Sequence, residues 1–132
     1  MYQYTQVTGD FDIASSQTIS GAGVGLTIVD GGALDRVLDV RPGAAAYLSG
    51  VTIRNGNPSS SAGGIINRGI LTLASCAVTA NAGIDFGGGI YNDMAGALTM
   101  TDTTVSDNVL AGANTSGGFS PAGATKSGLC GG

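Results

Sequence analysis

A strand-like segment recurs about every 25 residues along this chain, and this recurrence limits the fold more than any other feature. Apolar and polar residues alternate within each copy, as expected for a β-strand with one buried face. The copies are offset by 25, 25 and 27 residues. A glycine-rich motif between them repeats with an offset of 25. The strand-like copies are Leu26–Asp30, Ala46–Asn55, Leu71–Ala80 and Leu98–Asp107, and the glycine-rich copies are Gly63–Asn67 and Gly88–Asn92.

This spacing predicts a solenoid. A unit of 25 residues is shorter than a βαβ unit, which needs roughly 30 residues, and no helical period is present. Coils of near-constant length stack equivalent strands in parallel, so inward side chains form columns. We therefore predict an all-β, single-stranded parallel β-helix of about four coils of 25–29 residues. The predicted inward columns are Leu26, Val51, Cys76 and Thr103; Ile28, Ile53, Val78 and Val105; and Leu48, Leu73 and Met100.

Glycine and asparagine residues repeat at the predicted turns. Glycine permits a positive φ or a close approach of two backbones, and stacked asparagines form amide ladders that satisfy turn backbone. The predicted turn glycines are Gly63, Gly64, Gly88 and Gly89, and the predicted ladders pair Asn67 with Asn92 and Asn81 with Asn108.

The composition excludes several functional classes. The chain has no His, so Ser–His or Cys–His catalysis and His-ligated metals are excluded. Five cations and a net charge of −4 argue against nucleic-acid binding. No apolar run is long enough to cross a membrane, and Gly21–Gly25 lacks the Lys-Ser/Thr of a phosphate-binding loop. We predict no catalytic residue, cofactor or metal.

Four short motifs resemble a known family. Gly63–Ile66 and Gly88–Tyr91 alternate with Val78–Asn81 and Val105–Asn108. This alternation resembles the GGAI-type and FxxN-type repeats of polymorphic outer-membrane proteins and related bacterial surface β-helix proteins, with Val where the family often has Phe. The resemblance implies right-handed coils, a bacterial extracellular or cell-surface location, and an adhesin or autotransporter-passenger role. It carries over no catalytic residue.

We divide the chain into three parts. Residues 1–10 are predicted to form an extra strand or end cap, 11–116 the coils, and 117–132 an incomplete last coil or Gly-rich tail. The N-terminal residues lack the pattern of a signal peptide, so we expect a processed chain or part of a longer one. Open solenoid ends offer edges for pairing, and stacked copies would build a filament.

Several polar residues have both a functional and a structural interpretation. Asp30, Asn55 and Asp107, with Arg54 adjacent, are candidates for a carbohydrate or Ca²⁺ site, or are solvated turn residues. The turn residues Asp85, Asp93 and Asp102 are alternative Ca²⁺ ligands without the spacing of Ca²⁺-binding β-rolls. Asp35, Arg36, Asp39 and Arg41 are expected to form exposed ion pairs.

The remaining candidates are uncharged. Thr27, Thr52 and Thr104 are predicted to point outward. Ala77 interrupts this column, so it does not form the regular threonine array of ice-binding solenoids, and Thr is a common outward strand residue. The side chains of Tyr47 and Tyr91 either stack on sugars or pack against the coils. Cys76 is either a buried thiol or paired with Cys130.

From these features we predict a non-enzymatic structural or adhesive module. Its expected partners are further copies of itself, stacked end to end, or a glycan or protein of a cell surface, and neither nucleic acid nor a transmembrane segment is involved. The alternatives are a self-assembling filament subunit and a pectate-lyase-like, carbohydrate-active enzyme of the same fold.

Overall fold

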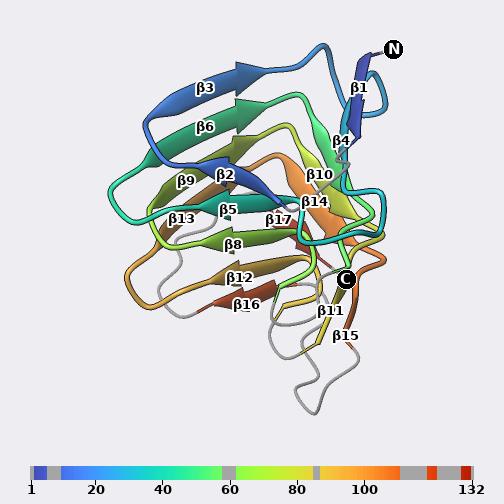
Figure 1. Cartoon of the computed structure of the whole chain (residues 1–132). Coiled ribbons are helices and arrows are strands. Elements are labelled where there is room, and N and C mark those ends of the chain that lie inside the picture. Colours follow the sequence, from blue (N-terminus) through green and yellow to red (C-terminus); the bar gives the residue numbers. More distant parts are fainter. Residues whose placement is uncertain are drawn as a thin grey trace.

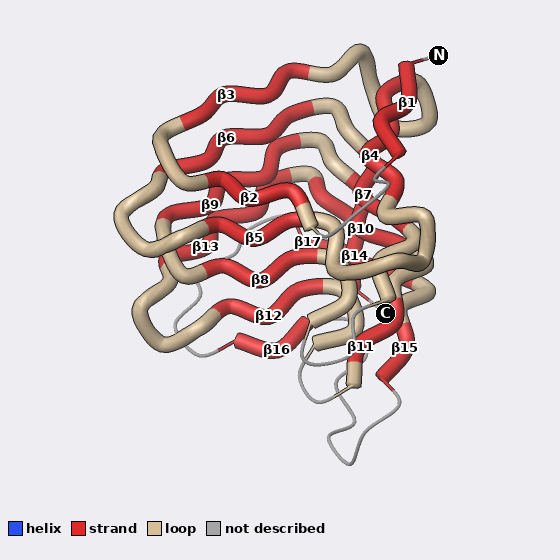
Figure 2. The backbone as a smooth tube through the Cα atoms, viewed as in Figure 1, coloured by secondary structure: helices blue, strands red, loops and turns tan. Residues whose placement is uncertain are grey.

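The computed structural model describes residues 2–5, 10–57, 62–84, 87–110, 119–121 and 129–131, with side chains for 10–57, 62–84 and 87–110. All regular structure in these ranges is β, and every strand pairing is parallel. Three sheets wrap around one core (Figures 1 and 2). The predicted parallel β-helix is therefore confirmed.

The sheets are named A, B and C. Sheet A contains β1 (Tyr2–Thr5), β4 (Thr27–Asp30), β7 (Thr52–Arg54), β10 (Ala77–Thr79), β14 (Thr103–Ser106) and β17 (Leu129–Gly131). Sheet B contains β2 (Phe11–Ile13), β5 (Leu38–Val40), β8 (Ile65–Asn67), β12 (Ile90–Asn92) and β16 (Phe119–Pro121). Sheet C contains β3 (Gln17–Ser20), β6 (Ala45–Ser49), β9 (Ile70–Ala74) and β13 (Ala97–Thr101), and β11 (Ala82–Gly83) pairs with β15 (Val109–Leu110).

Each coil passes through sheet B, then sheet C, then sheet A. Three full turns separate β2 from β12, and β12, β13 and β14 belong to the next coil. In Figure 1 sheet B lies in front of sheet C, and the descending coils wind right-handed. At the two ends of the chain, β1 pairs with β4, β16 with β12, and β17 with β14.

Inward side chains from the three sheets form the core. Leu48, Leu73 and Met100 are in register on sheet C and are fully buried. Ile19 precedes them in the same column and is only partly buried. Sheet A contributes a second column of buried residues, Ile53, Val78 and Val105. Val51, Cys76 and Thr103 are buried at the corner between sheets C and A, and the thiol of Cys76 is free.

The predicted columns are wrong in the first coil. Strand β4 pairs with β7 at an offset of 24 residues, so Val29 lies opposite Ile53 and packs against the core, while Ile28 lies opposite Thr52. A turn in which the Leu26 and Thr27 N–H groups donate to the Gly23 carbonyl leads directly into β4 and leaves Leu26 54% exposed. A shift of one residue exchanges the two faces of a strand. Ile28 therefore lies outside the main core cluster, although it is buried.

Two sets of left-handed residues turn the chain at the borders of sheet A. Gly50, Ser75 and Asp102 precede β7, β10 and β14 with φ of 48–63°. The residues that follow the same three strands are Asn55, Ala80 and Asp107, with φ of 56–59°. Asn and Asp tolerate this conformation better than most side chains, which explains their recurrence at one of these corners.

The predicted turn glycines allow close backbone approach, and neither Gly63 nor Gly64 has a positive φ. The Gly63 N–H donates to the Gly88 carbonyl at 3.1 Å, and the Ile65 N–H to the Gly89 carbonyl at 2.8 Å. A Cβ on Gly63 would lie 2.3 Å from the Ala82 carbonyl oxygen. Coils therefore approach here to a distance that only glycine permits.

The asparagine side chains connect successive coils. Asn67 Nδ2 donates to Asn92 Oδ1 at 2.7 Å and to the Ala97 carbonyl at 3.0 Å, while Asn67 Oδ1 accepts from the Gly69 N–H at 3.1 Å. In the second ladder, Asn81 Nδ2 donates to Asn108 Oδ1 at 3.0 Å. Asn67, Asn81 and Asn92 are buried, and the ladders satisfy polar backbone groups of the turns.

Substituting Gly63 with Ala should destabilise the solenoid by about 3 kcal/mol, because the new methyl group meets rigid backbone. Gly43→Ala is the control, since Gly43 has φ of 84° but no atom lies within 4 Å of the place that its Cβ would occupy. That variant should lose only about 1 kcal/mol, from backbone strain. Urea denaturation measures both, and equal losses would contradict close coil packing at Gly63.

Asn67→Asp should make stability depend on pH. The variant removes the N–H groups that bond Asn92 and Ala97 and places a carboxyl at a fully buried position. Burial raises the pKa of such a group in the folded state, so the variant is most stable below about pH 4 and loses stability as the pH rises. Denaturation at several pH values tests this, and the exposed-site variant Asn57→Asp should show no comparable loss.

Candidate functional site

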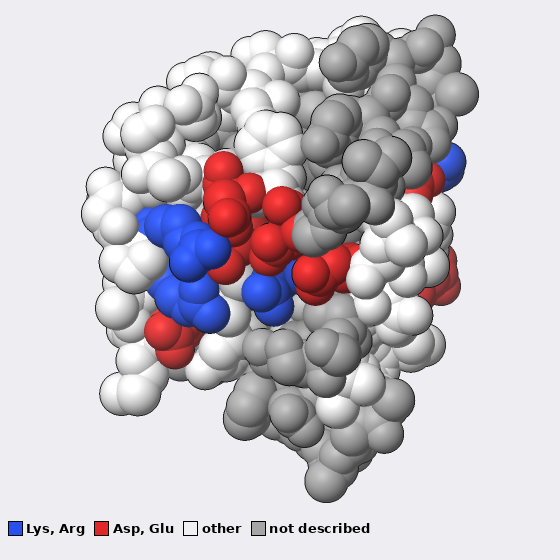
Figure 3. Space-filling view, in the orientation of Figure 1, with Lys and Arg blue, Asp and Glu red and all other residues white. Residues whose placement is uncertain are grey.

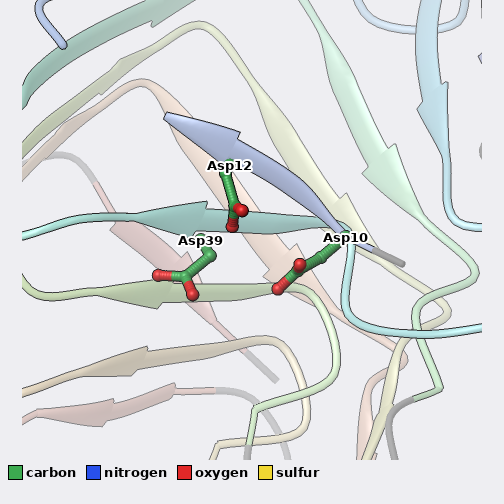
Figure 4. Close-up of side chains that lie close together, drawn as sticks. All are labelled: Asp10, Asp12 and Asp39. Carbon is green, nitrogen blue, oxygen red and sulfur yellow. The ribbon is translucent and has the colours of Figure 1, made fainter. Parts of the chain in front are cut away.

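A cluster of charged side chains lies on the outer surface of sheet B. Asp12 on β2 is directly opposite Asp39 on β5, and Asp10 precedes β2. One carboxylate oxygen from each of the three lies within 4.8 Å of the others. Figure 4 shows these three side chains converging in front of the sheet, and Figure 3 shows acidic and basic atoms gathered on this face. We call Asp10, Asp12, Asp39, Arg36, Arg41 and Arg68 the sheet B charge cluster.

Three arginines neutralise the three carboxylates. Arg36 lies 3.1 Å from Asp10, and Arg41 lies 3.0 Å from Asp12. Asp39 is only 3% exposed and is contacted by Arg68 at 3.2 Å, Arg41 at 3.4 Å and Arg36 at 3.9 Å.

These ion pairs connect three coils. Asp10 and Asp12 belong to the first coil, Asp39 to the second and Arg68 to the third. Burial raises the pKa of Asp10, although Arg36 opposes this effect. Carboxylate oxygens are suitable Ca²⁺ ligands, but here guanidinium groups already hold them. The three carboxylates and three guanidinium groups balance in charge, and their ion pairs connect successive coils.

A second ion pair lies on sheet A. Arg54 Nε and Asn55 Nδ2 each donate to Asp30 Oδ2 at 2.9 Å, and the Gly32 N–H donates to Asp30 Oδ1 at 2.8 Å. Burial alone would raise the pKa of Asp30, but these hydrogen bonds and the Arg54 charge together lower it.

The predicted column of Asp30, Asn55 and Asp107 does not form a common site. Asp30 lies opposite Arg54 instead of Asn55. Asp107 follows β14, three strands away from β4 in sheet A, or about 14 Å at the usual spacing. These three residues therefore do not together provide the candidate carbohydrate or Ca²⁺ site.

The other predicted sites are separate from one another. Asp35 accepts a hydrogen bond from the Arg36 N–H, Asp102 occupies a corner, and Asp85 lies outside the described residues. Asp93 accepts a hydrogen bond from the Tyr91 hydroxyl at 3.3 Å; burial, followed by the Asp93 charge, raises the pKa of Tyr91.

The prediction that Thr27, Thr52 and Thr104 share one outward column of sheet A is wrong. In the observed register Thr52 lies opposite Ile28, and Ala77 lies between Thr52 and Thr104. Thr52 is buried, and its hydroxyl accepts a hydrogen bond from the Gly25 N–H at 3.2 Å. Thr27, Thr52 and Thr104 therefore do not share one exposed column.

Sequence reasoning missed half of the sheet B charge cluster. It included Arg36, Asp39 and Arg41 but not Asp10, Asp12 or Arg68. The missed signal was the coil offset itself: Asp12 precedes Asp39 by 27 residues, and Arg68 follows Arg41 by 27. Residues one coil apart on an outward column are neighbours in space.

The outer face of sheet C differs from the other two sheets because none of its strands contains a charged residue. Tyr47 is 44% exposed on β6, and Ile70 is 57% exposed on the adjacent β9. Thr18, Tyr47, Thr72 and Thr99 form one outward column, and Ser20, Ser49, Ala74 and Thr101 form another. We call these residues, with Ala45, Ile70 and Ala97, the sheet C face.

Comparison with protein-family models, curated proteins and solved structures found no match to this chain. Among the described residues no helix is long and apolar enough to cross a membrane.

Replacing Asp39 with Asn should destabilise the protein by about 2 kcal/mol, because three arginines lose their shared buried carboxylate. Asp12→Asn is the matched control in the same column. Asp12 is 47% exposed and pairs only with Arg41 among the ion pairs of the described residues, so its loss should cost less than about 1 kcal/mol. Thermal or urea unfolding measures the difference, and a larger cost for Asp12→Asn would refute this ranking.

Asp30→Asn should make the free energy of unfolding depend less on pH under acidic conditions. The pKa of Asp30 is lowered in the folded protein, so its contribution is present above the unfolded pKa of about 3.9 and is lost as the pH falls further. Denaturation between about pH 5 and pH 2 should therefore show a smaller loss for the variant than for the wild type. Parallel curves would mean that the hydrogen bonds of Asp30 do not stabilise its charged form.

Proposed function

We propose that this chain is a non-enzymatic structural and adhesive β-solenoid module that acts at a bacterial cell surface or outside the cell. The observation that carries this proposal is that the charged side chains on sheet B form ion pairs with one another. In the sheet B charge cluster, carboxylates from different coils are paired with arginines, which favours a role in holding the coils together. The lateral faces of such a rigid rod are its available binding surfaces.

The resemblance to polymorphic outer-membrane protein repeats supports the proposed location. The repeated glycines and asparagines of those motifs occupy turn positions where coils contact each other. Motifs of this kind join coils into a long and rigid solenoid. The outward residues are not needed for these contacts and can differ between coils. Adhesive modules use this division between a constant scaffold and variable surfaces.

A self-assembling filament subunit is the second candidate. Among the described strands, β3 pairs only with β6 and β13 pairs only with β9, so each end of sheet C has one edge without a described strand partner. Ile19 on β3 is also less buried than its equivalent Leu48. Against this candidate, Leu98 and Met100 on β13 are as fully buried as Leu71 and Leu73 one coil away.

A carbohydrate-active enzyme is the third candidate, and the three converging carboxylates of Asp10, Asp12 and Asp39 are the observation in its favour. Such an enzyme would bind an acidic polysaccharide with Ca²⁺ and would shorten its chains. The arginines that already pair with these carboxylates make this candidate weaker than adhesion.

Adhesion and turnover are tested together with protein-coated beads. The beads are incubated with neutral and acidic polysaccharides and with bacterial and animal cells, with and without Ca²⁺. We expect retention of at least one surface and unchanged length of the recovered polysaccharides. Shortened chains, with the effect lost in Asp12→Asn, would replace the proposal with the enzyme, and absence of retention on every surface would reject adhesion.

The proposed location is tested separately. Antibodies against the chain should label intact cells of its source organism as strongly as permeabilised cells. Labelling that requires permeabilisation would place the protein inside the cell and reject the location.

A further inference from the structure

The sheet C face combines three properties that a binding surface for neutral sugars requires. It is regular, because its four strands are paired in register and the outward and inward residues of β6, β9 and β13 alternate. It has no charge. It also presents an exposed aromatic ring, Tyr47, near its centre.

Among the three main sheets, only sheet C has no charged residue in any of its strands. The outward columns of sheet B contain Asp12 and Asp39, and sheet A carries the Asp30–Arg54 pair. Desolvating a charged side chain costs far more free energy than desolvating a hydroxyl or methyl group. The charge-free face is therefore the one from which water is most easily displaced, and depletion of charge with exposure of Tyr is typical of interface centres.

The polar groups that remain on the face are mostly hydroxyls. Thr18 and Thr72 lie on either side of Tyr47 in its outward column, and Thr99 and Thr101 lie on β13, one strand beyond Thr72. A hydroxyl both donates and accepts hydrogen bonds, as sugar hydroxyls do. The Tyr47 hydroxyl makes no hydrogen bond with any described residue, so it is available to a ligand.

The size of the face favours a thin ligand over a protein. Five residues at about 3.3 Å and four strands at about 4.8 Å give an area of roughly 300 Å². A stable protein interface buries about 800 Å² on each partner, so a second copy docked on this face alone would be too small. A flat sugar chain covers such an area with few contacts.

From these properties we propose that the sheet C face binds a neutral, extended polysaccharide, with Tyr47 stacking on a sugar ring and the threonine hydroxyls bonding to its edges. This inference rests on the proposed adhesive function and names its ligand class. The net charge of −4 disfavours acidic polysaccharides by long-range repulsion.

The test measures depletion of the protein from solution by microcrystalline cellulose and by an insoluble neutral β-1,3-glucan, with cross-linked polygalacturonate as the acidic comparison. The wild type should bind at least one neutral polymer and not polygalacturonate. Tyr47→Ala should weaken this binding about tenfold, because it removes the stacking surface. Tyr47 points outward, so the melting temperature should change little.

Two matched substitutions that each introduce a negative charge test which face binds the polysaccharide. Thr99 on sheet C and Thr104 on sheet A are both exposed threonines of the same coil. Thr99→Glu should weaken binding at least fivefold, whereas Thr104→Glu should bind as the wild type does.

Four results would overturn the inference. Unchanged binding in Tyr47→Ala and Thr99→Glu would place the glycan site elsewhere and leave the adhesive function intact. Binding only to polygalacturonate, or only to cells, would reject the ligand class alone. A wild-type dimer that Thr99→Glu dissociates would assign the face to a second copy, and failure to bind any surface would reject the adhesive function as well.

Discussion

The parallel register between successive coils is the constraint on which the rest of the structure depends. Each strand bonds to its equivalent one turn away, so a residue has as neighbours those that lie about one coil length before and after it. This relation places Asn67 against Asn92, Asp12 against Asp39, and Leu48 against Leu73. The core, the amide ladders and the sheet B charge cluster all follow from the pairing of residues about one coil length apart.

Two kinds of interaction fix this register. Glycines such as Gly63 let backbones approach more closely than a side chain would allow, and the asparagine ladders require partners at one specific height. Apolar columns alone would allow a strand to shift its register against the next coil more easily, because Leu, Ile and Val can replace one another as packing partners at little cost. The ion pairs of Asp39 add a third restraint, on the outside of sheet B.

The repeat predicted the fold well, because both its length and its alternation are encoded locally. It misplaced Leu26 and Ile28, since the apparent match of Leu26–Asp30 to Val51–Asn55 ignored the turn at Gly23 that shortens the offset to 24. The charge cluster was half predicted, because Asp10, Asp12 and Arg68 become neighbours of Asp39 only when the coil offset is applied to outward residues. The sheet C face is visible in the sequence as strands without charge, but its continuity requires the observed register.

The central claim is that this solenoid works through its lateral faces and not through its ends. Sedimentation velocity over a wide concentration range, with negative-stain electron microscopy of the same sample, tests it most directly. The account predicts one species at the monomer mass of 12.8 kDa and no ordered assemblies. Long fibres with a regular axial repeat would contradict it and would make the ends of the solenoid its functional surfaces.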